Sequence, residues 1–247
     1  MTTATAVREP RQLGGAVAKV EAILAARGVD ATTVVDAAPS PEPVTALELA
    51  AARIPRRYRD ALADHARVLA WVEKIAAAGR PGPGGAPGIA YGPSLLIAGP
   101  TGTGKTYQAY GAVRSLLGAG VRLRWEAITT AELHATLRPR QGHDGERRFQ
   151  ELARSPLLLL DDLGAAKASE WTEELTYRLI DHRYVHELPT LITTNLPIAE
   201  LRTAVGDRVA SRLAEMTRRV ILDGPDRRRS TAPAWAAING PLRRGAT

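Results

Sequence analysis

The chain has 247 residues and is 45% hydrophobic, which is enough for one large domain with a sizeable core, alone or with a small appendage. It has no cysteine, no signal-peptide core at its start and no run long enough to span a membrane, so we expect a soluble cytoplasmic protein without disulfides, thiolate metal sites or a membrane partner. Nearly all of its net charge of +7 lies after residue 201, where ten arginines outweigh four acidic residues.

This arginine-rich C-terminal part favours a polyanionic partner, most naturally nucleic acid. A solvated surface, or arginines that serve ATP chemistry, would explain the composition equally well. At the other end, residues 1–50 are too few for a core of their own and predict an adaptor segment or a partly disordered arm. A short helix is expected at residues 13–26, and three prolines within residues 36–43 mark a linker.

Apolar residues recur at helical spacing between Tyr58 and Ile75, which predicts a helix from Tyr58 to about Ala78 that packs on the following domain. The next fifteen residues, 79–93, hold six glycines and four prolines and predict a flexible linker.

Residues 94–106, SLLIAGPTGTGKT, join a short apolar run to a glycine-rich turn and match the pattern of a phosphate-binding loop. Glycines allow the tight curl that aims backbone N–H groups inward, and the helix that follows adds its positive end. Lys105 can then reach the β- and γ-phosphates, and the Thr106 hydroxyl can ligate Mg²⁺. A chance glycine-rich turn is the alternative, but the strand-like run before it and the helical pattern after it argue against chance. The predicted nucleotide-binding residues are Gly99, Pro100, Thr101, Gly102, Thr103, Gly104, Lys105 and Thr106.

After the loop, the pattern predicts a helix to about Leu117 and a strand at residues 121–125. Thr129 or Thr130 is expected to cap a helix that runs through Leu137.

Two acidic residues follow the four leucines at 157–160, which predict a buried strand of a parallel sheet. The carboxyl end of such a strand is where these sheets bind ligands. Asp161 can hold Mg²⁺ through water, and Asp162 can orient and polarise the water that attacks a γ-phosphate.

Residues 189–195, PTLITTN, predict another buried strand, and Asn195 at its end can hydrogen-bond the γ-phosphate or the attacking water. An asparagine that only caps the next turn is the alternative. Helical segments are expected from residue 199 onward. Arg208 and Arg212 lie four residues apart on one helix face, either as solvated surface or within reach of a neighbouring subunit's ATP. The run DRRRS that begins at Asp226 can supply an arginine to the same ATP or to DNA.

In this order and spacing, the pieces resemble the DnaC/IstB family of AAA+ ATPases over about residues 50–230. The matching segments are IPRRY, GPTGTGKT, LLLLDDLG, RY…PTLITTN and GDRVASRL. The resemblance implies an α/β fold with a parallel sheet flanked by helices, and ATP with Mg²⁺ bound between the subunits of a ring, spiral or filament. We accordingly divide the chain into an adaptor region (1–50), an AAA+ ATPase domain (51–230) and a basic tail (231–247).

The resemblance also implies roles for single residues. Lys105 and Thr106 match Walker A, Asp161 and Asp162 match Walker B, and Asn195 matches sensor 1. Many AAA+ proteins have Glu where this chain has Asp162, which is one methylene shorter, so hydrolysis is expected to be slow. The two arginines at 208 and 212 match the box VII region that acts between subunits, with Arg212 preferred, and Arg229 is the best match to the sensor 2 arginine.

The family contains replicative-helicase loaders and the ATPase helpers of insertion-sequence transposases. We expect a DnaC-like loader that binds ATP and single-stranded DNA, forms an ATP-dependent homo-oligomer and contacts a helicase through its N-terminal region. The runner-up is an IstB-like helper that binds duplex DNA and recruits a transposase. A P-loop kinase or GTPase is a third hypothesis, but no guanine-reading NKxD motif is present. A structural ATP-binding adaptor without turnover is a fourth.

Overall fold

The computed structural model describes residues 46–81, 87–89, 91–138, 145–165 and 169–227, all within a compact unit that runs from Val44 to Thr247. The predicted helix at 13–26, the linker at 36–43 and the tail at 231–247 lie outside the described residues. Among those described, no helix is both long enough and apolar enough to cross a membrane.

Five parallel strands form the central sheet, in the order β4-β5-β6-β3-β7. Their bounds are β3 (Ser94–Ala98), β4 (Trp125–Thr129), β5 (Leu157–Asp161), β6 (Thr190–Thr194) and β7 (Thr217–Ile221). The three strands that carry the predicted site residues, β5, β6 and β3, are adjacent at the centre of the sheet. Their carboxyl ends therefore lie next to one another at one edge.

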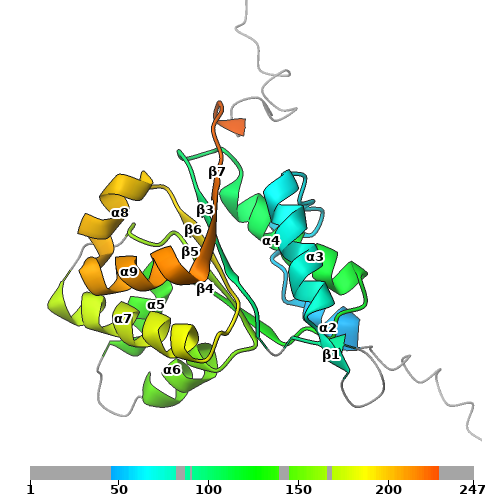
Figure 1. The fold of residues 1–247 in the computed structure, drawn as a ribbon, viewed down its shortest axis with the longest axis horizontal. Helices are drawn as coiled ribbons and strands as arrows, with labels where there is room; N and C mark the ends of the chain where they lie inside the picture. The colour runs from blue at the N-terminus through cyan, green and yellow to red at the C-terminus, as the bar shows by residue number, and fades with distance from the viewer. Residues whose placement is uncertain (1–45, 82–86, 90, 139–144, 166–168, 228–247) are drawn as a thin grey trace, which may run out of the picture. The chain divides into compact units, whose positions relative to one another are not determined.

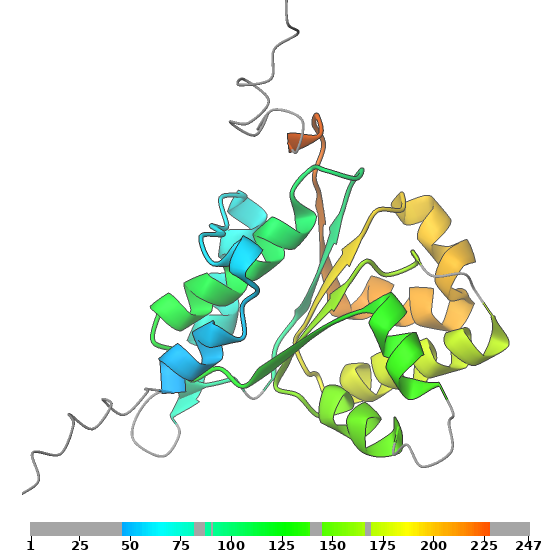
Figure 2. The ribbon, with the colours of Figure 1, turned by 180° about the vertical axis from the view of Figure 1, so that it is seen from behind.

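Helices cover both faces of the sheet (Figures 1 and 2). One face carries α2 (Ala46–Ala52), the 3-10 helix η1 (Arg56–Tyr58), α3 (Ala66–Ala77) and α4 (Lys105–Gly118). The other carries α5 (Thr130–Leu137), α6 (Gly145–Ala153), α7 (Glu170–Val185), α8 (Ile198–Val205) and α9 (Asp207–Met216). A short antiparallel pair, β1 (Arg80–Pro81) with β2 (Pro87–Gly88), lies outside the main sheet.

Alternate residues of each strand enter two separate cores, as the two-residue period of a strand requires. Leu95 and Ile97 pack under α3 and α4, whereas Leu96 packs against the helices of the opposite face. The core under α3 and α4 also contains Ala50 of α2, so this helix packs with the nucleotide-binding unit, although we assigned residues up to 50 to the adaptor region. The predicted fold class, a parallel sheet flanked by helices, is confirmed.

Three local predictions were wrong, and the first is that only helical segments follow residue 199, because β7 is a strand at Thr217–Ile221. The helix expected from Tyr58 begins only at Ala66, and Leu62, which the helical pattern placed inward, is 64% exposed. The strand expected at residues 121–125 begins four residues later than predicted and runs from Trp125 to Thr129. The expected helix cap is confirmed, because the Thr129 side chain accepts from the backbone N–H of Glu132 at 3.1 Å.

Residues 59–65 do not continue a helix because they lie flat against α4. A methyl group added to Gly111 of α4 would lie 2.3 Å from the backbone nitrogen of Ala63. The Arg114 side chain donates to the carbonyl of Ala61 at 2.7 Å, and the Gln108 amide oxygen accepts two backbone N–H groups of the same segment. A glycine in mid-helix thus allows a contact that no larger residue permits.

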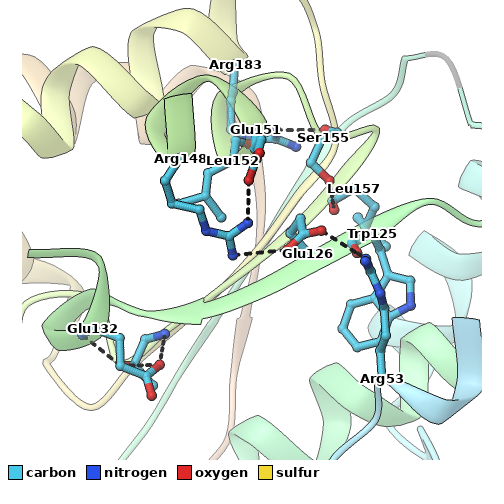
Figure 3. A network of polar contacts seen from close by, with 11 residues as sticks. Arg53, Trp125, Glu126, Glu132, Arg148, Glu151, Leu152, Ser155, Leu157 and Arg183 are labelled. Atoms are coloured by element: carbon cyan, nitrogen blue, oxygen red, sulfur yellow. Dashed lines mark hydrogen bonds and ion pairs between the residues drawn. The ribbon is translucent and has the colours of Figure 1, made fainter. Parts of the chain in front are cut away.

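The buried side chain of Arg183 joins α6 to the amino ends of β5 and β6. It donates to the hydroxyl of Thr190 at 2.8 Å and to the carbonyls of Ser155 and Pro189 at 2.8 and 2.6 Å. Figure 3 shows the guanidinium directed at Ser155. Burial lowers the pKa of Arg183 to about 9, which leaves it charged at pH 7. No acid among the described residues pairs with it, so carbonyl oxygens and the Thr190 hydroxyl compensate its lost hydration.

The contact at Gly111 can be tested against a second glycine of the same helix. We expect Gly111→Ala to lower the free energy of unfolding by about 1–3 kcal/mol, because the backbone of residues 61–64 must shift. Gly118→Ala is the control: nothing lies within 4 Å of its added methyl group, so this change should stabilise by about 0.5 kcal/mol. Urea unfolding measures both, and equal stabilities for the two variants would contradict the close approach.

Candidate functional site

A cavity of about 820 Å³ lies at the carboxyl ends of β3, β5 and β6, where parallel sheets bind ligands. Its volume is within the range of small-molecule sites. Three segments line it: the glycine-rich loop with the start of α4, the residues after β5 and β6, and parts of the chain before α3 and after β7. The lining residues are Arg57, Tyr58, Asp64, Thr101, Gly102, Gly104, Lys105, Thr106, Tyr107, Asp161, Asp162, Asn195 and Arg227.

The glycine-rich loop curls as predicted. Gly102 and Gly104 have φ angles of 87° and 95°, which residues with a side chain rarely adopt. Gly104 is the N-cap of α4, so the free N–H groups of the first turn of α4 are available at the wall of the cavity. The Lys105 ammonium donates to the carbonyl of Pro100 at 2.9 Å, which places a positive charge inside the curl. These features together can cradle a phosphate chain.

Oxygen atoms from three elements meet beside the loop. The Thr106 hydroxyl donates to Asp161 Oδ1 at 3.0 Å, and the Thr193 hydroxyl donates to the same oxygen. Burial raises the pKa of Asp161; the hydrogen bond from Thr193 opposes this rise, the charge of Asp162 adds to it, and the bond from Thr106 opposes it. The described residues contain no group of three or more metal-ligating side chains. One hydroxyl and one carboxylate fit Mg²⁺, which usually completes its shell with phosphate oxygens and water.

Asp162 and Asn195 stand at the ends of adjacent strands, are exposed and line the same cavity. Asp162 has a left-handed backbone with φ of 56°, and its N–H donates to the Thr193 hydroxyl at 3.0 Å. Such a conformation is uncommon for a residue other than glycine and marks a constrained position. A carboxylate and an amide can here face a ligand held by the loop.

The two predicted α9 arginines lie elsewhere. Arg208 donates to Glu174 at 3.0 Å and stacks over the Tyr177 ring at 4.0 Å. Arg212 donates to Asp181 at 3.0 Å and lies over the Tyr184 ring at 4.6 Å. Both side chains are thus held against α7, and neither lines the cavity of its own chain.

Several residues in or beside the cavity were not predicted as site residues. Arg227 lines the cavity, and its N–H donates to the carbonyl of Gly102 at 3.0 Å; our choice among the adjoining arginines, Arg229, lies outside the described residues. Tyr58 belongs to the IPRRY segment but had no assigned role, and its ring stacks on Tyr110 at 4.6 Å. Thr193, which ties the two acids together, gave no signal because threonine is common in buried strands.

A family model described as "IstB-like ATP binding protein" matches residues 90–221, more than half of the chain. The chain belongs to this IstB-like ATP-binding family. The matched segment contains the phosphate loop, both acids and Asn195, and we call the cavity that they line the nucleotide cavity.

Curated relatives of this IstB-like chain include a replicative helicase loader and a protein of an insertion sequence. The replicative helicase loader DnaC of Escherichia coli (strain K12) is 26% identical over 123 residues, which is 49% of each protein. The putative ATP-binding protein of insertion sequence IS21 from Pseudomonas aeruginosa is 29% identical over 117 residues, 47% of this chain and 43% of that protein. The chain thus spans about half the length of the curated relatives it matches.

Among solved structures, the crystal structure of the DnaC helicase loader has a TM-score of 0.58 and 26% identity, over 68% of this chain and 100% of that chain. The crystal structure of DnaI has a TM-score of 0.53 at 20% identity, over 75% of this chain and 93% of that chain, and supports the fold alone. The AAA+ architecture that the resemblance implied is confirmed.

The hydrogen bond between Thr193 and Asp161 generates a prediction about Mg²⁺. We expect Thr193→Val to weaken binding of a fluorescent ATP analogue about 10-fold with Mg²⁺ and much less with EDTA, because a hydrogen bond to a charged group is worth about 1.5–3 kcal/mol. Thr194→Val is the control, since the Thr194 hydroxyl donates to the carbonyl of Leu163 at 2.7 Å and to no carboxylate. An equal loss with and without Mg²⁺ would contradict the role of Thr193.

Proposed function

We propose that this protein hydrolyses ATP and acts as an accessory of DNA replication, a DnaC-like loader of a replicative helicase that binds single-stranded DNA. One observation carries the ATPase part: the phosphate loop, Asp162 and Asn195 line one cavity. A phosphate loop alone can only bind a nucleotide, whereas hydrolysis also needs a carboxylate that faces the γ-phosphate. The likeness to DnaC in sequence and structure supports the loader part.

In the proposed reaction, the loop and the N-terminal end of α4 hold the triphosphate. The Lys105 ammonium, which here donates to the Pro100 carbonyl, donates instead to the β- and γ-phosphates. Thr106, and Asp161 through water, would hold Mg²⁺, which would neutralise phosphate charge. Asp162 orients and polarises the attacking water, and Asn195 hydrogen-bonds that water or the γ-phosphate. Asp162 has a shorter side chain than the Glu common at this position, so slow turnover is expected.

The arginines extend this proposal to an ATP-dependent homo-oligomer. Arg208 and Arg212 lie away from their own cavity, so we assign them to ATP bound by a neighbouring subunit, with Arg212 preferred. An arginine supplied in this way stabilises charge on the γ-phosphate and is worth ~10³-fold or more in rate. For the arginine contributed within the chain, Arg229 stays a proposal, and Arg227 is the second candidate because it lines the cavity.

The second candidate function is an IstB-like transposition helper that binds duplex DNA and recruits a transposase. The family description and the 29% identity to the IS21 ATP-binding protein favour it. The nucleotide cavity is common to both functions and does not separate them.

Action between subunits predicts complementation. Lys105→Ala and Arg212→Ala should each reduce phosphate release by at least ~100-fold, because one removes the phosphate contact and the other the arginine. A one-to-one mixture should regain a measurable fraction of wild-type activity, since some interfaces then combine an intact Lys105 with a partner's intact Arg212. Failure of every mixture, including one with Arg208→Ala, would refute action in trans. Wild-type protein without phosphate release would refute the ATPase itself.

The two DNA functions predict opposite strand preferences. A loader should bind a single-stranded oligonucleotide more tightly than the matching duplex in the presence of an ATP analogue, and Lys105→Ala should lose this dependence on nucleotide. Fluorescence anisotropy at several salt concentrations measures both affinities, because phosphate contacts make them salt-dependent. Tighter binding to the duplex than to the single strand would contradict the loader function and favour the transposition helper.

A further inference from the structure

A larger cavity, of about 1120 Å³, lies at the opposite end of the sheet from the nucleotide site. It is bordered by α2, by the segment that enters β4, and by α6 with the turn that follows it; Figure 3 views the polar contacts of this region. The strands are five residues long, so the two cavities are separated by roughly 16 Å of sheet. Both can therefore be occupied at the same time.

We call this cavity the arginine groove, because arginines dominate its charged lining. Two glutamates, Glu126 and Glu151, oppose six arginines, which leaves a formal charge of +4. The nucleotide cavity, in contrast, has three basic and three acidic lining residues. The six arginines are Arg53, Arg122, Arg124, Arg147, Arg148 and Arg154.

Ion pairs engage both acids of the groove. Glu126 accepts from Arg53 at 2.9 Å and from Arg148 at 3.1 Å, and Arg148 also donates to Glu151 at 3.1 Å (Figure 3). Arg147 reaches Glu151 at 3.3 Å. This network links α6 to β4 and to the residue that follows α2 across the groove.

Three arginines remain outside this network. Arg122, Arg124 and Arg154 are exposed and form no ion pair with any residue that the structure describes. Each can meet an external anion without first breaking a contact. Exposed cations that line one groove and lack acidic partners raise the local concentration of a polyanion.

The floor of the groove offers little to read a base. Trp125 is 2% exposed, and its indole N–H already donates to the carbonyl of Ala50 at 3.1 Å. No aromatic face is therefore free for stacking among the described lining residues, and the exposed donors are guanidinium groups, which suit phosphate oxygens. Such a surface holds a backbone without selecting a sequence.

We propose that the arginine groove binds the phosphodiester backbone of DNA. This site would be the place at which the chain holds DNA in the proposed function. The identity of the polyanion rests on that proposed function. Residues of the nucleotide cavity take no part in this contact.

The test removes only the three unpaired arginines. We expect Arg122→Gln/Arg124→Gln/Arg154→Gln to bind DNA at least ~10-fold more weakly at 100 mM salt. The slope of log K against log salt should fall by about 2 on single strands or about 3 on duplex, from ~0.7 or ~0.9 per phosphate contact. Anisotropy with random-sequence oligonucleotides and an ATP analogue gives both values, and the arm whose fall reaches its own expected value identifies the bound form.

The matched control is Arg59→Gln/Arg67→Gln/Arg218→Gln, which removes the same charge from exposed positions outside both cavities. It should keep the wild-type slope, and both triple variants should bind the ATP analogue normally and unfold at the wild-type temperature. Equal DNA affinities for the two triple variants would contradict DNA binding by the arginine groove. The proposed function would still stand if the wild type binds DNA. Wild-type protein that binds neither form would overturn both.

Discussion

The Asp161 carboxylate accepts hydrogen bonds from threonines of two different elements, Thr106 on α4 and Thr193 on β6. This contact fixes the distance between the phosphate loop and the acidic end of β5. It depends on strand order, because β6 lies between β3 and β5 and brings Thr193 alongside both acids. The backbone N–H of Asp162 donates to the same hydroxyl, so one threonine contacts the carboxylate of Asp161 and the backbone of Asp162. The chemistry of the cavity follows from this parallel register.

The part of the site that could be predicted from the sequence has a local signal. The ends of β3, β5 and β6 each combine a short buried run with a turn of distinctive composition, so the loop, the two acids and Asn195 were found. Thr193 and Arg227 could not be found in this way. Thr193 looks like any β-branched strand residue until β6 is placed beside β5. Arg227 stands in a run of like residues, and its place beside the cavity follows from a tertiary contact, the hydrogen bond from its N–H to the carbonyl of Gly102.

The fold shows the same division between local and distant causes. The helix expected from Tyr58 fails because Gly111, some fifty positions later, admits the backbone of residues 61–64 against α4. β7 was not predicted as a strand because it is an edge strand, and Val220 is its single buried residue. Its pattern therefore lacks the apolar run of a central strand. In both places a tertiary contact outweighs the local preference.

One structural segment belongs to both cavities. Leu49, Ala50 and Arg53 border the arginine groove, and Arg57 and Tyr58 border the nucleotide site. Only a few residues join these contacts, with Pro55 stiffening the link between α2 and η1. The two cavities therefore share one short segment of backbone between Leu49 and Tyr58.

The position of β3 also has a consequence for synthesis on the ribosome. This strand pairs with β6 and β7, both of which are made later, and the contact between Ser94 and Thr190 spans 96 residues. At ~5–20 residues per second, the nascent strand waits about 5–20 s for its first neighbour. During that interval the unpaired backbone groups and apolar side chains of β3 are exposed and can form non-native contacts. The strand that leads into the phosphate loop is therefore synthesised early but buried only after β6 has been made.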